Sequence, residues 1–254
     1  MEHFAARATA KTIPIIALAR GELKAWSAKQ SKMVQAWLKA TGFKASTNQI
    51  SVVPGRDGNI SRVLFGLGRA TPDLWRFAAL TRALPKGTYA LESHLGKKGQ
   101  ITPEMSNAAA LGWGMAAYRF HELKTSKAPR LPKLVWPEAC DRKAVTAALE
   151  ATYLVRDLVN RPAGHLGPRE LAAEAEALAK QHGAKVKVIE GQALLKNNYP
   201  AIHAVGRGSE RPPCLADIRW GDEKHPKLTL VGKGVVFDSG GLDLKSAVGM
   251  KLMK

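Results

Sequence analysis

Three charged residues near the end of the sequence are of types that could do chemistry together. Lys233, Asp238 and Lys245 lie in the glycine-punctuated stretch 231–254, which follows a short apolar run at 228–231. Asp238 is followed by Ser239-Gly240-Gly241, and the two glycines allow the backbone to turn tightly. We therefore expect the carboxylate at the mouth of a strand, where sites form in open α/β sheets.

The residue types indicate metal chemistry. A carboxylate suits hard or borderline divalent cations. A lysine can bind a metal only through a neutral amine, and two adjacent dications would lower its pKa enough for that. Lys233 and Asp238 are thus candidate ligands, and a charged Lys245 could stabilise an oxyanion. The same three residues could instead form only ion pairs, and spacing alone does not decide between the two.

The elements expected to position this stretch alternate between strands and helices. Strands are predicted at 12–19, 50–53, 60–67, 88–91, 134–136, 185–189, 215–220 and 228–231. Helices are predicted at 21–40, 71–84, 102–120, 141–159 and 168–181, with a short helix or turn at 194–202. Thr71-Pro72 should begin one of these helices, with proline at its first position. The alternation predicts an α/β protein with a mainly parallel sheet flanked by helices.

Two details refine this plan. Gly112 and Gly114 lie inside an expected helix, where they lower its helix propensity, which indicates close packing against a neighbouring element or, alternatively, a ligand contact. A proline-rich, aperiodic segment at 125–132 marks the clearest composition break. We place the domain boundary at 125–140, which separates residues 1–130 from residues 131–254.

Composition and charge limit the classes of partner that the chain could bind. The chain has 254 residues, 45% of them hydrophobic and 24% charged, which is typical of a soluble globular protein. Its net charge is +18, and residues 1–130 hold 20 Lys and Arg against 7 Asp and Glu. This excess could bind nucleic acid. Because the basic residues are scattered, a solvated basic surface, or one facing an acidic patch, is the favoured interpretation.

Other patterns argue against several classes. The two cysteines form no C-x-x-C motif, so neither a cysteine zinc site nor a disulfide framework is predicted, and a cytoplasmic location fits. No signal peptide is recognisable, and the apolar run 13–19 is too short to span a membrane. Gly66-x-Gly68 and Gly206-x-Gly208 complete no nucleotide-binding fingerprint, so neither predicts a nucleotide site.

The terminal stretch also resembles a known signature. Val231-Gly-Lys-Gly-Val-Val-Phe-Asp-Ser-Gly-Gly-Leu-x-Leu-Lys245, continuing to Met250-x-x-Met253-Lys254, is similar to the metal-binding signature of the leucyl (cytosol) aminopeptidase family. Segments 156–168 and 204–213 resemble other parts of that family's catalytic domain. The resemblance covers roughly residues 150–254, whereas residues 1–130 are similar to the family's N-terminal domain only in placement and general α/β character.

The resemblance implies a hexameric metalloaminopeptidase that releases N-terminal amino acids from peptides with two divalent metal ions, manganese or zinc. By the same resemblance, Lys233 binds one metal, Asp238 contacts both, Lys245 is catalytic, and Met253 lines the pocket for the substrate's N-terminal side chain. The implied fold is a small N-terminal α/β domain followed by a catalytic domain built as a mainly parallel α/β/α sandwich.

The remaining acidic ligands and the catalytic arginine of the family would fall beyond Lys254. We therefore expect a catalytic domain that is incomplete at its C-terminus and a chain that is inactive by itself. Two alternatives are nucleic-acid binding by the basic N-terminal half and a non-enzymatic remnant that assembles with full-length subunits.

Overall fold

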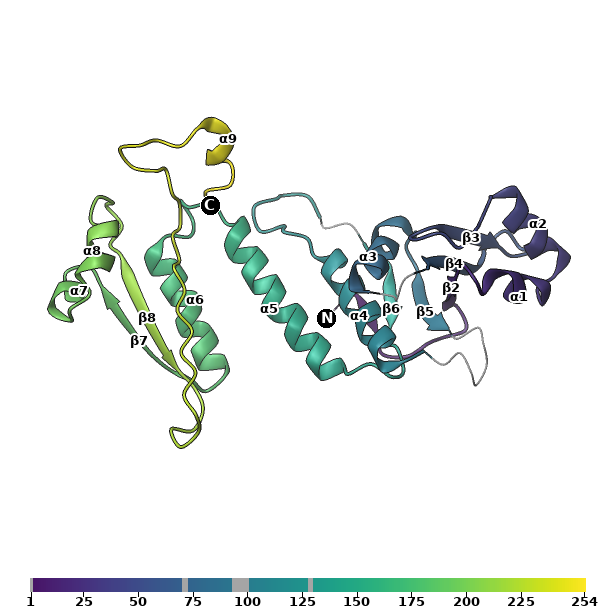
Figure 1. Ribbon diagram of the computed structural model, residues 1–254, viewed down its shortest axis with the longest axis horizontal. Helices are drawn as coiled ribbons and strands as arrows, with labels where there is room; N and C mark the ends of the chain where they lie inside the picture. The colour runs from purple at the N-terminus through teal and green to yellow at the C-terminus, as the bar shows by residue number, and fades with distance from the viewer. Residues whose placement is uncertain (1, 70–72, 93–100, 128–129) are drawn as a thin grey trace. The chain divides into compact units, whose positions relative to one another are not determined.

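The computed structural model describes residues 2–69, 73–92, 101–127 and 130–254. The chain is an α/β protein, as predicted, and it divides into two compact units, Met1–Leu154 and Val155–Lys254. Figure 1 shows the elements of each unit. Within the described ranges, no helix is long and apolar enough to cross a membrane.

The first unit is built on a six-stranded sheet with the strand order β1-β6-β5-β2-β4-β3. Its strands are β1 Phe4–Ala5, β2 Ile13–Ala19, β3 Ile50–Pro54, β4 Ile60–Gly68, β5 Thr88–Glu92 and β6 Lys133–Val135. All neighbours pair in parallel except β3 and β4, which form an antiparallel hairpin. The sequence predicts an α/β fold for this half of the chain, and the structure adds that its sheet is mostly parallel, with the very short β1 as an edge strand.

The hairpin turn follows from its residue types. Asp57 accepts a hydrogen bond of 3.1 Å at Oδ1 from the backbone N–H of Asn59, and Gly58 adopts a left-handed φ of 78°. Asp, Asn and Gly favour such turns because they tolerate or stabilise this backbone. The prediction of a strand, a turn and a returning strand over 50–67 is confirmed.

Side chains of the central strand β2 alternate between two separate cores, because successive residues of a strand point to opposite faces. Ile15 and Ala17 join the core beneath α3 Leu74–Ala83, α4 Pro103–Ala117 and the first half of α5 Arg142–Asn160. Ile16 and Leu18 join the core on the other face, beneath two further helices. The sheet is therefore covered on both faces, as a parallel sheet requires.

The helix predicted over 21–40 is wrong as a single element. The chain forms α1 Leu23–Ala28 and α2 Lys32–Ala40 instead. Ser31 separates them with an extended backbone, and its hydroxyl accepts a hydrogen bond of 3.4 Å from the N–H of Val34. A serine in this role starts a helix rather than continuing one. The break lets Trp26 and Val34 enter the same core.

Helix α3 begins at the side-chain cap of Asp73, while the expected start at Thr71-Pro72 lies outside the described residues. Helix α4 starts after Thr102, as predicted, and ends at Ala117, before the predicted Phe120. Its glycines mark close packing, which confirms the interpretation above. A Cβ on Gly112 would lie 2.0 Å from the carbonyl oxygen of Leu74 on α3.

Helix α5 passes from the first unit into the second. Val145 and Leu149, in its first half, are buried in the core of the first unit. This packing explains why the compact units divide within the helix. The domain boundary at 125–140 stays a prediction about where the two folding modules meet.

The second unit contains α6 Pro168–Gln181, β7 Lys185–Glu190, α7 Ala193–Lys196, α8 Pro200–Gly206, β8 Cys214–Arg219 and α9 Ala247–Met250. Strands β7 and β8 pair antiparallel, whereas the alternation of elements predicts a parallel pair here. The register explains the difference: Glu190 at the end of β7 pairs with Cys214 at the start of β8. The two short helices between them remain at that end and do not carry the chain back along the strand.

The strand predicted at 228–231 is not formed. Leu228, Leu230 and Val231 are 82%, 86% and 94% exposed, and no described strand pairs with them. A strand needs a neighbour to satisfy its backbone N–H and C=O groups. Without one, this apolar run stays an exposed, extended connection (Figure 1).

Candidate active site

Asp238 lies in a tight loop whose geometry depends on glycine. Its Oδ1 accepts a hydrogen bond of 3.0 Å from the backbone N–H of Gly240. Gly240 has a φ of 92°, and a Cβ there would lie 2.2 Å from the carbonyl oxygen of Asp243. The glycine is thus needed for the tight turn predicted from the sequence, and this turn places the backbone amide that orients the carboxylate.

Lys245 returns to the same carboxylate. Its Nζ lies 3.4 Å from Oδ2 of Asp238, and its backbone N–H donates a hydrogen bond of 3.0 Å to the carbonyl of Ser239. The two side chains are 34% and 48% exposed. Water and salt screen a pair this open, so its role is positional more than stabilising.

Met253 is held beside Asp238 through the backbone. The N–H of Asp238 donates a hydrogen bond of 3.1 Å to the carbonyl of Met253. The next residue, Lys254, donates from Nζ to the carbonyl of Leu158 in α5 at 3.1 Å, and its partial burial lowers the pKa of its ammonium group. These contacts bring three of the four predicted site residues together: Asp238, Lys245 and Met253.

The fourth predicted residue, Lys233, is exposed and its side chain has no hydrogen bond or ion pair with any described residue. Its charge still acts on Asp238. The Gly240 N–H has the largest lowering effect on the pKa of the Asp238 carboxyl, followed by Lys245 and then Lys233. The three charged residues selected from the sequence thus form one electrostatic group.

A second set of contacts joins the segments that resemble the aminopeptidase family. Arg211, from segment 204–213, donates to the carbonyl of Ala163 at 2.6 Å and to the carboxylate of Glu170 at 2.8 Å. Gly167 makes room, because a Cβ there would lie 2.3 Å from the Arg211 guanidinium carbon. The sequence indicated both segments but not this bridge, which needs residues 48 positions apart.

The donor set meets only part of what a divalent metal needs. Lys233 and Asp238 supply one amine and one carboxylate, and no group of three or more His, Cys, Asp or Glu capable of holding a metal occurs in the part of the chain that the structure describes. A structural or catalytic zinc takes about four ligands. The residues fit part of a metal site and do not complete one.

Two family models match the chain. Residues 153–254 match the catalytic domain of the cytosol aminopeptidase family, and residues 13–137 match the N-terminal domain of M17 aminopeptidases. The chain belongs to the cytosol aminopeptidase family. The match to the N-terminal domain goes beyond the general likeness in placement that the sequence suggested.

Individual relatives agree with the family assignment. A probable cytosol aminopeptidase of Corynebacterium glutamicum is 33% identical over 250 residues, which span 94% of this chain and 49% of that protein. One from Rhodococcus jostii is 43% identical over 162 residues, 58% of this chain and 32% of the relative.

Solved structures show the same fold. The cytosol aminopeptidase of Coxiella burnetii is similar with a TM-score of 0.89 and 41% identity, over 100% of this chain and 54% of that one. The bottromycin maturation enzyme BotP in complex with Mn has a TM-score of 0.75 and 33% identity, over 96% of this chain and 53% of that one. The chain spans about half the length of these relatives, or less.

Proposed function

We propose that the protein to which these residues belong is a metal-dependent aminopeptidase that releases N-terminal amino acids from peptides. The observation that carries the proposal is the grouping of Asp238, Lys245 and Met253 in one loop system within the region that matches the family's catalytic domain. The arrangement supplies an oriented carboxylate, a nearby cation and an adjoining methionine.

Each residue has a proposed role. Lys233 and Asp238 hold divalent metal, with Asp238 oriented by the Gly240 N–H so that one of its oxygens faces Lys245. When bound, a pair of such ions supplies Lewis acidity and activates water. Lys245 donates a hydrogen bond to the oxygen on which negative charge develops as the peptide carbonyl is attacked. Met253 offers an apolar contact to the side chain of the residue being released.

The proposed metals are two ions of manganese or zinc. The Mn complex of BotP favours manganese as the first ion to test. Because Lys233 and Asp238 are too few to hold two ions, the full site needs further donors, and residues 1–254 by themselves should be inactive. The expected result is no manganese-dependent hydrolysis of leucine p-nitroanilide by this chain alone. Hydrolysis that Asp238→Asn abolishes would contradict this expectation.

A chimera tests the function itself. Residues 1–254 can be joined to the part of the Coxiella burnetii cytosol aminopeptidase that lies beyond its match to this chain. The proposal predicts hydrolysis of leucine p-nitroanilide that requires added manganese and stops with a chelator. A folded, manganese-loaded chimera without this activity would refute the aminopeptidase proposal.

Assembly and location follow from the same proposal. We infer a homo-hexamer for the whole protein and a cytoplasmic location. Light scattering on the purified chimera should give six copies, and a monomer or dimer would contradict the inference. An alternative is that the 254-residue chain is a remnant that only assembles with full-length subunits, in which case it should elute with the chimera when the two are mixed.

Nucleic-acid binding is a second candidate function, favoured by the basic excess of residues 1–130. Contacts dominated by phosphates weaken steeply as salt rises, because bound counterions are released. A mobility shift of a short DNA duplex by the whole chain at low salt, lost at physiological salt, would support it. No shift at low salt would exclude it.

A further inference from the structure

The sheet of the first unit has a topological switch point between β2 and β4. The chain leaves β2 for α1 and α2, which cover the face of Ile16 and Leu18. It leaves β4 for α3, which covers the face of Ile15 and Ala17. Connections that depart to opposite faces open a crevice at the carboxyl ends of neighbouring parallel strands, and this is where ligands bind in open α/β sheets.

A polar loop that contains Ala45, Ser46 and Thr47, between α2 and β3, packs against this crevice. The N–H of Gly68 donates to the carbonyl of Ala45 at 3.0 Å, and a Cβ on Gly66 would lie 2.1 Å from the carbonyl oxygen of Ser46. A Cβ on Gly68 would lie 2.2 Å from the hydroxyl oxygen of Thr47. The two glycines that failed to complete a phosphate fingerprint thus serve another purpose: they let Ser46 and Thr47 approach the end of β4.

Two cavities meet at this place. The first, of about 420 Å³, is lined by Arg20, Ser46, Thr47, Gly68 and Arg69. Arg20 directly follows β2 and Arg69 directly follows β4, and both residues line this cavity at the strand ends. The backbone N–H of Arg20 also donates to the carbonyl of Gly68 at 2.9 Å, which fixes the two strand ends together.

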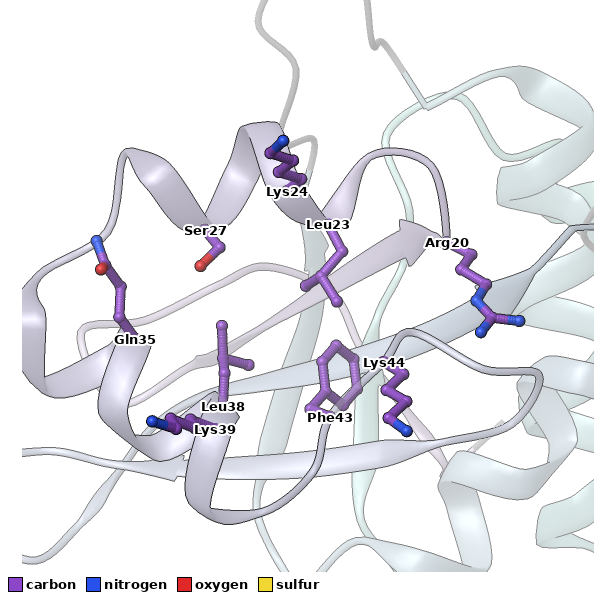
Figure 2. Close-up of a pocket in the computed structure, with 9 residues that line it drawn as sticks. All are labelled: Arg20, Leu23, Lys24, Ser27, Gln35, Leu38, Lys39, Phe43 and Lys44. Atoms are coloured by element: carbon purple, nitrogen blue, oxygen red, sulfur yellow. The ribbon is translucent and has the colours of Figure 1, made fainter.

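The second cavity, of about 460 Å³, shares Arg20 with the first and extends over α1 and α2. Its lining residues are Arg20, Leu23, Lys24, Ser27, Gln35, Leu38, Lys39, Phe43 and Lys44. Figure 2 shows the apolar side chains of Leu23, Leu38 and Phe43 facing one another, with the four cationic side chains around them. An apolar floor with a cationic rim suits a ligand that has both an apolar body and an anionic group.

The charges in the two cavities have one sign. Among the described lining residues there are five cations and no carboxylate. The nearest carboxylate along the chain, Glu22, lies outside both linings and accepts a hydrogen bond of 2.7 Å from the N–H of Ala19. Arg20 and Arg69 form no ion pair with any described residue, so no described carboxylate neutralises them.

We propose that the first unit binds a small nucleoside phosphate, with the phosphate between Arg20 and Arg69 and the base over Leu23, Leu38 and Phe43. Arginine forks match phosphate oxygens with paired hydrogen bonds, and the hydroxyls of Ser46 and Thr47 add further donors. Both cavities have the volume usual for small-molecule sites. Binding here is separate from peptide hydrolysis and needs none of Lys233, Asp238 or Lys245.

Calorimetry of the 254-residue chain with adenosine monophosphate tests the proposal. Arg20→Gln removes the guanidinium common to both cavities, and the loss of a charge-assisted hydrogen bond predicts affinity weaker by about tenfold or more. Arg56→Gln, on the exposed hairpin turn, is the matched control and should change the affinity by less than about twofold. Arg20 is exposed, so circular dichroism should show a folded variant.

Two further ligands separate the parts of the site. Inorganic phosphate should compete with adenosine monophosphate, and Arg69→Gln should weaken both. Adenosine without phosphate should bind more weakly than the monophosphate, and Leu23→Ala, at a partly buried lining residue, should weaken adenosine monophosphate but not inorganic phosphate. Because no metal or peptidase activity enters these measurements, a failure here leaves the aminopeptidase proposal unaffected.

The proposal is overturned by any of three results. Adenosine monophosphate fails to bind at millimolar concentration, or Arg20→Gln and Arg56→Gln weaken it equally. The third is an Arg20-dependent interaction with a single-stranded oligonucleotide but none with the mononucleotide, which would make the surface a nucleic-acid contact and not a small-molecule site.

Discussion

At the scale of single residues, Asp238 is the most informative side chain of the candidate site. The N–H of Gly240 and the cations Lys245 and Lys233 all stabilise its ionised form, and together they lower the pKa of its carboxyl. Because the pKa of this carboxyl is lower in the folded chain than in the unfolded chain, its ionisation stabilises the fold at pH values above its unfolded-state pKa. This contribution disappears as pH falls through the folded pKa.

The first prediction concerns this pKa. In the presence of a chelator, NMR titration of the Asp238 carboxyl should give a midpoint below that of an ordinary aspartate, and Lys245→Met should raise it because a positive charge 3.4 Å away is removed. Lys251→Met, at an exposed lysine whose charge does not act on the Asp238 pKa, should leave the midpoint unchanged. Equal midpoints in the wild-type chain and Lys245→Met would refute the pairing.

Residue types and the aminopeptidase resemblance were enough to select Lys233, Asp238, Lys245 and Met253. For Asp238, Lys245 and Met253 the structure adds what positions them, namely the Gly240 amide and the carbonyls of Ser239 and Met253. These are backbone groups, which every residue carries, so sequence patterns give no signal for them. The roles of the four side chains remain predictions until they are tested.

At the scale of elements, the helix-packing glycine Gly112 offers a sharp test. A Gly→Ala change in a helix interior normally stabilises by roughly 1 kcal/mol through propensity. Here the added methyl would meet the backbone carbonyl of Leu74 at 2.0 Å, and that backbone cannot move freely. We expect Gly112→Ala to destabilise the chain by about 1–3 kcal/mol, measured by urea unfolding.

The matched control is Gly21→Ala, because no described residue other than its chain neighbours has an atom within 4 Å of the position that a Cβ would take there. Its stability should change by less than about 1 kcal/mol. If Gly112→Ala proves as stable as Gly21→Ala, α3 and α4 do not pack as closely as described.

In the exposed run 228–231, unlike at Gly112, we expect a substitution to change stability very little. Leu230 is 86% exposed, so Leu230→Ser should change the free energy of unfolding by less than about 0.5 kcal/mol. Leu149, which is fully buried in α5, provides the comparison, and Leu149→Ala should cost about 2–5 kcal/mol. A large loss with Leu230→Ser would mean that this run is packed after all.

Sequence periodicity correctly predicted those elements whose structure depends mainly on their own residues. The strand β2 and the helix α6 carry their apolar pattern and their start signals locally. The break at Ser31, the antiparallel pairing of β7 with β8, and the exposed state of 228–231 depend on which partner each segment meets. Tertiary partners override local preference, and one sequence does not identify them.

At the scale of the whole molecule, the two units differ in how much core they have. The first unit buries side chains on both faces of its six-stranded sheet. In the described second unit, the buried apolar residues are Leu166, Ala172, Ala179, Ile189 and Leu194. A small core and the exposed apolar run 228–231 agree with a chain that spans about half of its relatives' length.

The proposed nucleoside phosphate site could not be found from the sequence alone. Arg20, Phe43, Thr47 and Arg69 belong to separate segments that only the β2–β4 pairing and the loop over β4 bring together. The candidate active site, by contrast, is contained in the 21 residues from Lys233 to Met253, which is why its members could be recognised together.

The central claim is that Lys245 acts in peptide hydrolysis, and kcat/KM of the chimera for leucine p-nitroanilide tests it most directly. Removing a donor that stabilises a developing oxyanion costs about 10²–10³-fold, so Lys245→Met should lower kcat/KM by that factor. Lys251→Met should stay within about twofold of the parent chimera. Equal activities of the folded Lys245→Met and Lys251→Met chimeras would contradict the account.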